Sequence, residues 1–117
     1  MKFEIGEIDL AGILYYEGRN HMNKLISPGT KIEVILIREP NNTFDTNAIE
    51  VLLNNPEVVE WKDEARKLGY IPANQAKFFA LLIDLGILSI GGYITTSNVS
   101  GSGKHFINVM LTAKERE

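Results

Sequence analysis

The stretch "REPNNTFDTNAIEV", Arg38 to Val51, separates two apolar runs and is longer than a turn requires. The run over 31–38 is rich in β-branched residues and predicts a strand, and 48–53 predicts its partner. A tight hairpin needs only two connecting residues, whereas this connection is a long polar segment with one aromatic ring, Phe44, near its middle. The stretch therefore predicts an antiparallel strand pair with an enlarged loop.

Outside this stretch the pattern predicts further strands and one helix. Short apolar runs separated by glycine and polar turns are typical of strands. From Ala73 the apolar residues recur with helical spacing, and Gly86 is well placed to cap the helix. The strands are expected over 3–16, 31–38, 48–53, 67–71, 87–96 and 106–112. Because the connections are short, about six mostly antiparallel strands and one main helix predict a small β-barrel plugged by the helix.

The expected helix has a wider apolar arc than one buried stripe needs. The arc contains Ala76, Phe79, Ala80 and Ile83. Phe78 and Leu81 fall among polar residues outside it, so another part of the protein is expected to cover them. Either the charged segment around Trp61 or a partner chain would serve, and we favour the segment.

Length and composition indicate one globular domain. A chain of 117 residues is long enough for one sizeable core, so 1–117 is expected to form a single domain. No apolar run is long enough to cross a membrane and no basic-then-apolar leader is present, which predicts a cytoplasmic protein. The formal net charge of −3 argues against a broad electrostatic grip on duplex phosphates. A small site for one or two nucleotides remains compatible with it.

The residues that carry most enzymatic chemistry are scarce. There is no cysteine, and His21 and His105 are the only imidazoles. Neither histidine lies in a hydrolytic or metal-binding motif, and "GSGK" at 101–104 lacks the spacing and the following helix of a phosphate-binding loop. We therefore expect no catalytic residue, no metal and no cofactor, and a protein that is not an enzyme.

The aromatic residues fall at the ends of the expected strands. Tyr15, Tyr16, Phe44, Tyr70 and Phe106 could then converge on one rim of a barrel. Aromatic rings stack on nucleobases with about 1–3 kcal/mol per base, and neighbouring amides and carboxylates bind sugar and base edges. The alternative is structural: such aromatics also cap barrel cores, and Asn and Asp in loops bond to their own backbone. Each residue alone fits the structural role, whereas their combination favours a site.

Several of these motifs together resemble the HIRAN domain family. The family occurs at the N-terminus of helicase-like fork-remodelling ATPases and as short stand-alone bacterial or phage proteins. The matching residues are Gly12-Ile13-Leu14-Tyr15-Tyr16, Arg38-Glu39-Pro40, Asn42 to Ile49, and Gly69-Tyr70-Ile71-Pro72. The resemblance extends over about residues 8–112, with 113–117 expected as a frayed tail. It implies a mainly β fold with α, a small OB-like antiparallel β-barrel.

The resemblance implies a non-catalytic module that binds the 3′-hydroxyl end of single-stranded DNA in repair or replication. The implied nucleic-acid-binding residues are Tyr15, Tyr16, Asn42, Phe44, Asp45, Tyr70 and Phe106. Asp45 would accept a hydrogen bond from the terminal hydroxyl, because a carboxylate attracts that donor and repels a phosphate. The implied partners are the DNA end and a helicase or nuclease on another chain. We expect no membrane contact, and a monomer or weak homodimer.

The sequence departs from the DNA-binding members of the family at three positions. Leu14 stands where those members have an arginine, Phe44 lacks a tyrosine hydroxyl, and Tyr70 replaces a histidine. The loss of the arginine removes a strong phosphate partner and implies weaker binding or a different ligand. The alternative is a protein-interaction or structural domain that has kept the fold but lost DNA binding.

Overall fold

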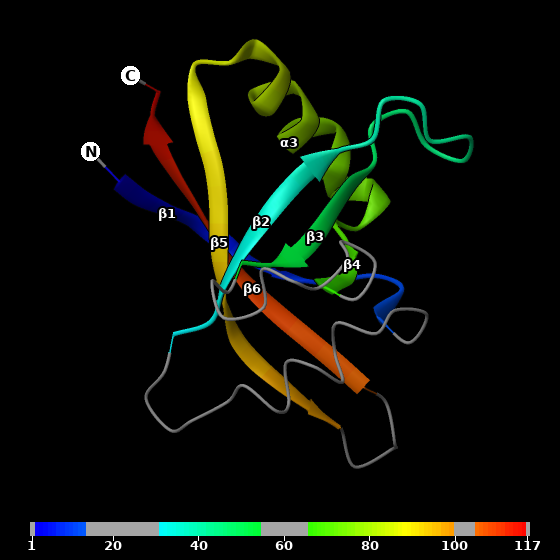
Figure 1. Cartoon of the computed structure of the whole chain (residues 1–117), viewed down its shortest axis with the longest axis vertical. Coiled ribbons are helices and arrows are strands. Elements are labelled where there is room, and N and C mark those ends of the chain that lie inside the picture. The colour runs from blue at the N-terminus through cyan, green and yellow to red at the C-terminus, as the bar shows by residue number, and fades with distance from the viewer. Residues whose placement is uncertain (1, 14–30, 55–65, 100–104, 117) are drawn as a thin grey trace.

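The computed structural model describes residues 2–13, 31–54, 66–99 and 105–116. Six strands and one helix lie within these ranges (Figure 1). They are β1 (Lys2–Asp9), β2 (Glu33–Arg38), β3 (Ile49–Leu53), β4 (Lys67–Tyr70), α3 (Ala73–Leu85), β5 (Leu88–Val99) and β6 (His105–Glu115). The prediction of a mainly β fold with about six strands and one main helix is confirmed.

The strands form one antiparallel sheet in the order β1-β6-β5-β2-β3-β4. The two edges of this strongly twisted sheet meet at one point, where Ala11 and Tyr70 exchange backbone hydrogen bonds of 2.9 and 3.0 Å. Gly69 permits the approach, because a Cβ there would lie 2.5 Å from Ala11 O. The sheet thus curls as an OB-like fold does, but its hydrogen-bond ladder is not closed.

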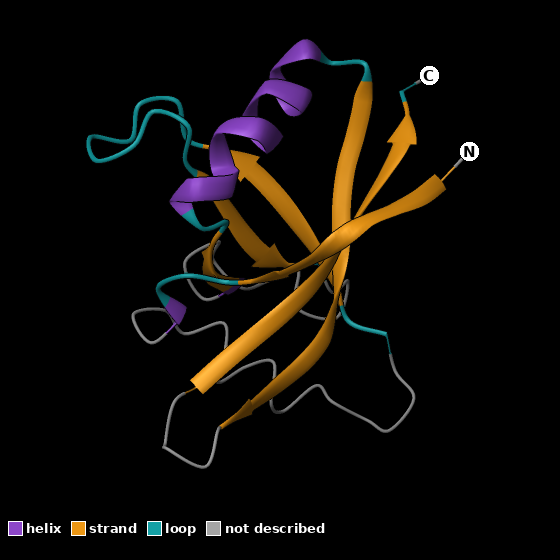
Figure 2. Cartoon of the chain, turned by 180° about the vertical axis from the view of Figure 1, so that it is seen from behind, coloured by secondary structure: helices purple, strands orange, loops and turns teal. Residues whose placement is uncertain are grey.

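One face of the sheet and the helix enclose the core. Strand alternation sends Val34, Val51 and Leu111 to this inner face, where all three are buried. Ala76 and Phe79 pack against the same cluster from α3, which lies over the sheet (Figure 2). Full burial of a valine, leucine or phenylalanine side chain stabilises a fold by roughly 1.5–3 kcal/mol. The two strands that carry the β2–β3 loop are therefore anchored in the core through residues such as Val34 and Val51.

The helix ends as the sequence predicts and leaves part of its surface in water. Gly86 adopts a left-handed φ of 71° and donates its N–H to Ile83 O, which caps the helix. Phe78 is 58% exposed and Leu81 57% exposed. Trp61, expected to cover them, lies outside the described residues. No helix in the described part of the chain is long and apolar enough to span a membrane.

Several strand boundaries differ from the expectation: β5 continues to Val99 instead of ending at 96, and larger differences lie near the two ends of the chain. The first strand ends at Asp9, and residues 14–16 of its expected range lie outside the described ones. The expected frayed tail is wrong for residues 113–115, because β6 continues to Glu115. Lys114 pairs with both Lys2 and Ser89 there.

Candidate functional site

The loop between β2 and β3 projects from the sheet as an ordered structure (Figure 1). The backbone N–H of Glu39 donates to Ala48 O at 2.9 Å and closes the base of the loop. Two turns follow inside it, with Asn42 N donating to Glu39 O and Ala48 N donating to Asp45 O, each at 3.0 Å. The enlarged loop predicted from the sequence is therefore built from hydrogen-bonded turns.

Asn42 organises the centre of this loop. Its Oδ1 accepts the backbone N–H groups of Phe44 at 2.9 Å and Asp45 at 3.0 Å. Its Nδ2 donates to Glu39 Oε1 at 3.2 Å. The side chain predicted to touch a ligand is thus used by the loop itself, as asparagines in turns commonly are.

Asp45 also has a structural role. One carboxylate oxygen, Oδ1, accepts the backbone N–H of Asn47 at 2.8 Å, and the residue is half-buried. This is an Asx-turn, the structural alternative considered from the sequence. The turn leaves the second carboxylate oxygen unused, so a ligand could bond to it without opening the turn.

Phe44 stands out because its side chain is 99% exposed. A phenylalanine in water contributes no burial to the stability of the fold. The alternative that this aromatic caps the core is therefore wrong at this position. The loop instead presents a bare ring to solvent, on a backbone held by the hydrogen bonds that the Phe44 and Asp45 N–H groups donate to Asn42 Oδ1.

Arg38 fastens the loop to the helix. Its Nη1 donates to Thr46 O and Ala48 O, both at 3.0 Å. Its Nε and Nη2 donate to the carboxylate of Asp84 on α3 at 3.0 and 3.1 Å. The hydrogen bonds from Arg38 hold the pKa of Asp84 below its ordinary value. The sequence showed Arg38 only as a strand end and did not indicate Asp84.

A charged network fixes Tyr70 beside the loop. Its hydroxyl donates to Glu39 Oε1 at 2.6 Å and accepts a hydrogen bond from Lys67 Nζ at 2.6 Å. Lys67 also forms an ion pair with Glu50 across 3.3 Å. Sequence analysis missed the roles of Glu39, Lys67 and Glu50, although the "REP" motif that contains Glu39 was a signal.

The network shifts three pKa values. Burial and the hydrogen bond to Glu39 raise the pKa of Tyr70 to about 12. Burial raises the pKa of Glu39, but its hydrogen bonds from Tyr70 and Asn42, with the charge of Lys67, outweigh burial and leave it lowered. Burial and the neighbouring Glu39 charge raise the pKa of Glu50. Tyr70 therefore remains a protonated donor to Glu39 well above neutral pH, up to about 12.

An open cleft of about 540 Å³ lies between the loop and Tyr70. It is lined by Arg38, Glu39, Pro40, Asn41, Asn42, Thr43, Phe44 and Tyr70. The described lining holds one positive residue, Arg38, and one negative residue, Glu39, so it has no net charge and suits an uncharged planar group better than a phosphate. A ring, amides and a hydroxyl within one cleft are groups that recognise a nucleobase and its sugar.

The structure brings together three of the seven predicted site residues. Asn42, Phe44 and Tyr70 line the cleft, whereas Asp45 belongs to the same loop but not to the lining. Phe106 is half-buried near the start of β6, which lies at the end of the sheet away from the loop (Figures 1 and 2). Tyr15 and Tyr16 lie outside the described residues. Among the described residues there is no cluster of acidic or histidine side chains that could hold a metal.

The fold and the cleft define a small, curled β-sheet protein with a hydrogen-bonded loop between β2 and β3. The sequence matches the HIRAN domain over residues 4–114, and the chain belongs to this family. A comparison with curated protein sequences finds no significant match.

Three solved structures share the fold. A protein from Lactobacillus plantarum is 26% identical with a TM-score of 0.70, and the match covers 99% of this chain and 98% of that one. The crystal structure of the human HLTF HIRAN domain is 22% identical with a TM-score of 0.65, covering 99% and 81%. The NMR structure of that domain in its DNA-bound conformation is 21% identical with a TM-score of 0.57, covering 99% and 80%.

Proposed function

We propose that this chain is a non-catalytic module that binds the 3′-hydroxyl end of single-stranded DNA. The observation that carries the proposal is the bare ring of Phe44 beside a cleft, on a loop ordered by its own hydrogen bonds. Exposed aromatic rings on rigid supports are stacking platforms for unpaired bases. Membership of the HIRAN family, with one solved member in a DNA-bound conformation, supports the same conclusion.

The proposed roles differ among the residues of the site. Phe44 stacks on a base, and Tyr70, which lines the same cleft, borders the adjacent nucleotide. Asn42 contributes by holding the loop, because its amide is already bonded within it. Tyr15 and Tyr16 are proposed to contact the terminal bases and their phosphate. Phe106 would contact only a strand that extends beyond the cleft.

Selectivity for the strand end is proposed to come from Asp45. Its Oδ1 is occupied by the Asn47 N–H, which leaves Oδ2 as the acceptor for a 3′-hydroxyl. A phosphate in the same place would meet the carboxylate and would be repelled. The offset charges of Arg38 and Glu39 add no attraction for phosphate in the cleft. A hydroxyl end is therefore preferred over a phosphorylated one.

Fluorescence anisotropy tests the proposal directly. Two short oligonucleotides labelled at the 5′ end, one with a 3′-hydroxyl and one with a 3′-phosphate, are titrated with the protein at low salt. We expect tighter binding to the hydroxyl end. Equal binding to both ends would contradict end recognition, and no binding to either would contradict DNA binding.

The proposed biological setting rests on the proposed role of the chain as a binding module of the HIRAN family. A module that only binds strand ends would direct an activity carried by another chain, such as a helicase or nuclease acting in DNA repair or replication. We propose that it acts as one domain in the cytoplasm, as a monomer or weak homodimer.

A second candidate function is protein interaction, and one observation favours it. Apolar side chains on and just after α3 are exposed: Phe78, Leu81, Leu85 and Ile87. Leu81→Ser tests this surface by sedimentation velocity over a range of protein concentrations. Loss of a concentration-dependent dimer in the variant would support the interaction surface. Identical sedimentation of both proteins as monomers would contradict self-association through it.

A further inference from the structure

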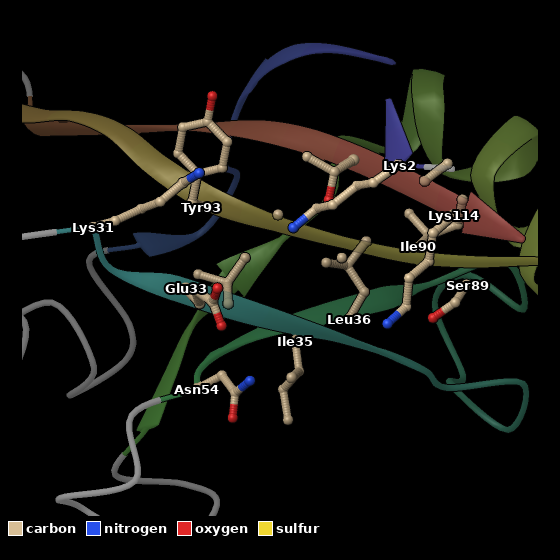
Figure 3. Close-up of a pocket in the computed structure, with 15 residues that line it drawn as sticks. Lys2, Lys31, Glu33, Ile35, Leu36, Asn54, Ser89, Ile90, Tyr93 and Lys114 are labelled. Carbon is tan, nitrogen blue, oxygen red and sulfur yellow. The ribbon is translucent and has the colours of Figure 1, made fainter. Parts of the chain in front are cut away.

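A second cleft, of about 300 Å³, lies on the outer face of the sheet and carries three lysines (Figure 3). It is lined by Lys2, Lys31, Glu33, Val34, Ile35, Leu36, Asn54, Ser89, Ile90, Gly91, Gly92, Tyr93, Thr112, Ala113 and Lys114. In β6, Leu111 points into the core, so its neighbour Thr112 and then Lys114 point to the opposite face. The cleft is thus on the face of the sheet that α3 does not cover. It shares no described lining residue with the cleft beside Phe44, although β2 contributes residues to both.

Strand register brings the lysines together. Lys2 of β1 and Lys114 of β6 are direct cross-strand partners, and Lys114 faces Ser89 of β5 on its other side. Both lysine side chains extend over the floor of the cleft in Figure 3. Lys31 lies at the other end, where its ammonium group sits 4.0 Å from the centre of the Tyr93 ring. Tyr93 is held in turn by a 2.7 Å hydrogen bond to Glu4.

Gly91 keeps the floor of the cleft open. A Cβ at Gly91 would meet its nearest atoms, Thr112 Oγ1 and Val34 O, at 3.9 and 4.0 Å, which are ordinary contacts. The glycine is therefore not required by packing. Gly92 differs, because a Cβ there would lie 2.6 Å from Met110 O. A larger residue at Gly91 would fit the sheet but would fill the space between the lysines.

The charges of the cleft are unbalanced. Like charges directly opposite on neighbouring strands repel, as those of Lys2 and Lys114 do. Within the described residues neither ammonium group has an ion-pair partner. Glu33 is the one carboxylate among the described lining residues, so these residues carry an excess of positive charge although the whole chain has a net charge of −3. An anion in the cleft would remove the repulsion.

A neighbouring hollow extends the same surface. It measures about 310 Å³ and shares Ser89 and Lys114 with the lysine cleft. Arg116 adds a further positive charge there, beside Glu115. Positive groups therefore follow one another from Lys31 through Lys2 and Lys114 to Arg116. Such a row of charges suits an extended polyanion better than a single ion.

We propose that this lysine cleft binds phosphates of a single-stranded nucleic-acid backbone. Ammonium groups such as those of Lys2 and Lys114 attract phosphates regardless of base sequence, and among the described lining residues Tyr93 is the one aromatic ring. The cleft is a surface separate from the one that holds Phe44, and its use does not require recognition of a 3′ end. It supplies the phosphate attraction that the offset charges of the Phe44 cleft lack.

The test uses a labelled sixteen-nucleotide oligothymidine with a 3′-phosphate, so that a hydroxyl-end site contributes nothing. Its affinity is measured by anisotropy over a series of salt concentrations. Lys114→Gln is expected to weaken binding and to lower the slope of log K against log salt by about 0.7, the value for one phosphate contact on a single strand. Lys2→Gln with Lys114→Gln is expected to lower it by about twice that.

Matched controls separate this site from general charge. Lys77→Gln removes the same charge from an exposed position on α3 and is expected to leave the slope unchanged. Gly91→Val keeps every lysine and is expected to weaken binding by filling the floor. Equal effects of Lys114→Gln and Lys77→Gln would overturn the proposal.

The experiment also distinguishes phosphate binding from a role in which the lysines only prevent association with other chains. Edge strands often carry lysine to prevent pairing with other chains, and β1 is an edge strand. If that is their only role, the double variant will self-associate in sedimentation while oligonucleotide affinity is unchanged, which would overturn the proposal. Lysine-dependent binding without any preference for a hydroxyl end would support this site and contradict only the end-recognition proposal. Binding that prefers a hydroxyl end but does not depend on the lysines would contradict only the proposal for the lysine cleft.

Discussion

Tyr70 donates a 2.6 Å hydrogen bond to Glu39, a residue 31 positions earlier in the chain. The bond joins the end of β4 to the first residue of the β2–β3 loop. Asn42 donates to the same oxygen, Glu39 Oε1, from inside the loop. One carboxylate oxygen therefore ties both sides of the cleft together, and the geometry of the candidate site depends on it.

Tyr70→Phe tests this connection. The change keeps the ring but removes the hydrogen bonds with Glu39 and Lys67. Because the groups are partly exposed, we expect the free energy of unfolding to fall by about 1 kcal/mol. Urea denaturation followed by circular dichroism measures the change. An unchanged midpoint would show that the network does not contribute to stability.

The raised pKa of Tyr70 predicts a loss of stability at high pH. The folded pKa is about 12 against an ordinary value of 10, because burial and the bond to Glu39 favour the protonated form. The contribution is fully present below pH 10 and is lost as the pH rises toward 12. The phenolate absorbance of the wild type is measured against pH, and that of Tyr70→Phe is subtracted. The difference should show one tyrosine, Tyr70, titrating at about 12. A difference curve centred at an ordinary tyrosine pKa would contradict the network.

Asn42→Ala is expected to loosen the loop. The change leaves the N–H groups of Phe44 and Asp45 without their acceptor. We expect a loss of about 1 kcal/mol in the free energy of unfolding and faster amide hydrogen exchange at these residues. Asn41→Ala is the matched control, since Asn41 is exposed and makes no hydrogen bond to the described residues. Equal exchange rates in both variants would argue against the role of Asn42.

Asp45→Asn separates the turn from the proposed binding role. Its amide oxygen can still accept the Asn47 N–H, so the Asx-turn and the stability are expected to remain. The second oxygen becomes an NH₂ group, which cannot accept a hydrogen bond from a hydroxyl. Anisotropy should then show no preference between 3′-hydroxyl and 3′-phosphate ends. Asp45→Ala should lose both the preference and some stability. A retained preference in Asp45→Asn would exclude the carboxylate as its source.

Phe44→Ala is expected to change binding and not folding. Because the ring is 99% exposed, the free energy of unfolding should stay within about 0.5 kcal/mol. Loss of one stacking ring should weaken oligonucleotide binding by about 1–3 kcal/mol, roughly 5- to 150-fold. Phe78→Ala removes another exposed ring, on α3, and should leave binding unchanged. The opposite ranking of the two variants would favour the helix surface as the functional one.

Local patterns predicted most of the elements because the forces that form them are local. The β-branched run before Arg38, the helical spacing after Ala73 and the glycine cap at Gly86 all appear in the structure. The loop was recognised as enlarged from composition alone. Its internal bonds were considered only as the alternative to a binding role, and in Asn42 and Asp45 they are present.

Site prediction failed where it needed distances between strands. Phe106 was grouped with Tyr70 because both lie near strand ends, but the pattern does not say which end of the sheet a strand end occupies. The partners of Tyr70 were missed for the same reason, since Lys67, Glu50 and Glu39 come together only through the pairing of β2, β3 and β4.

The sequence by itself determined the strands, the helix, the ordered loop and the family, because these depend on alternation, turn residues and short motifs. Only the tertiary structure decided the strand order, which brings Lys2 and Lys114 from the two ends of the chain into direct register. It also decided that Phe44 faces solvent and that Tyr70 bonds to Glu39. The physical reason is that side-chain burial and the pairing of distant strands are settled by the whole sheet as it curls around one core.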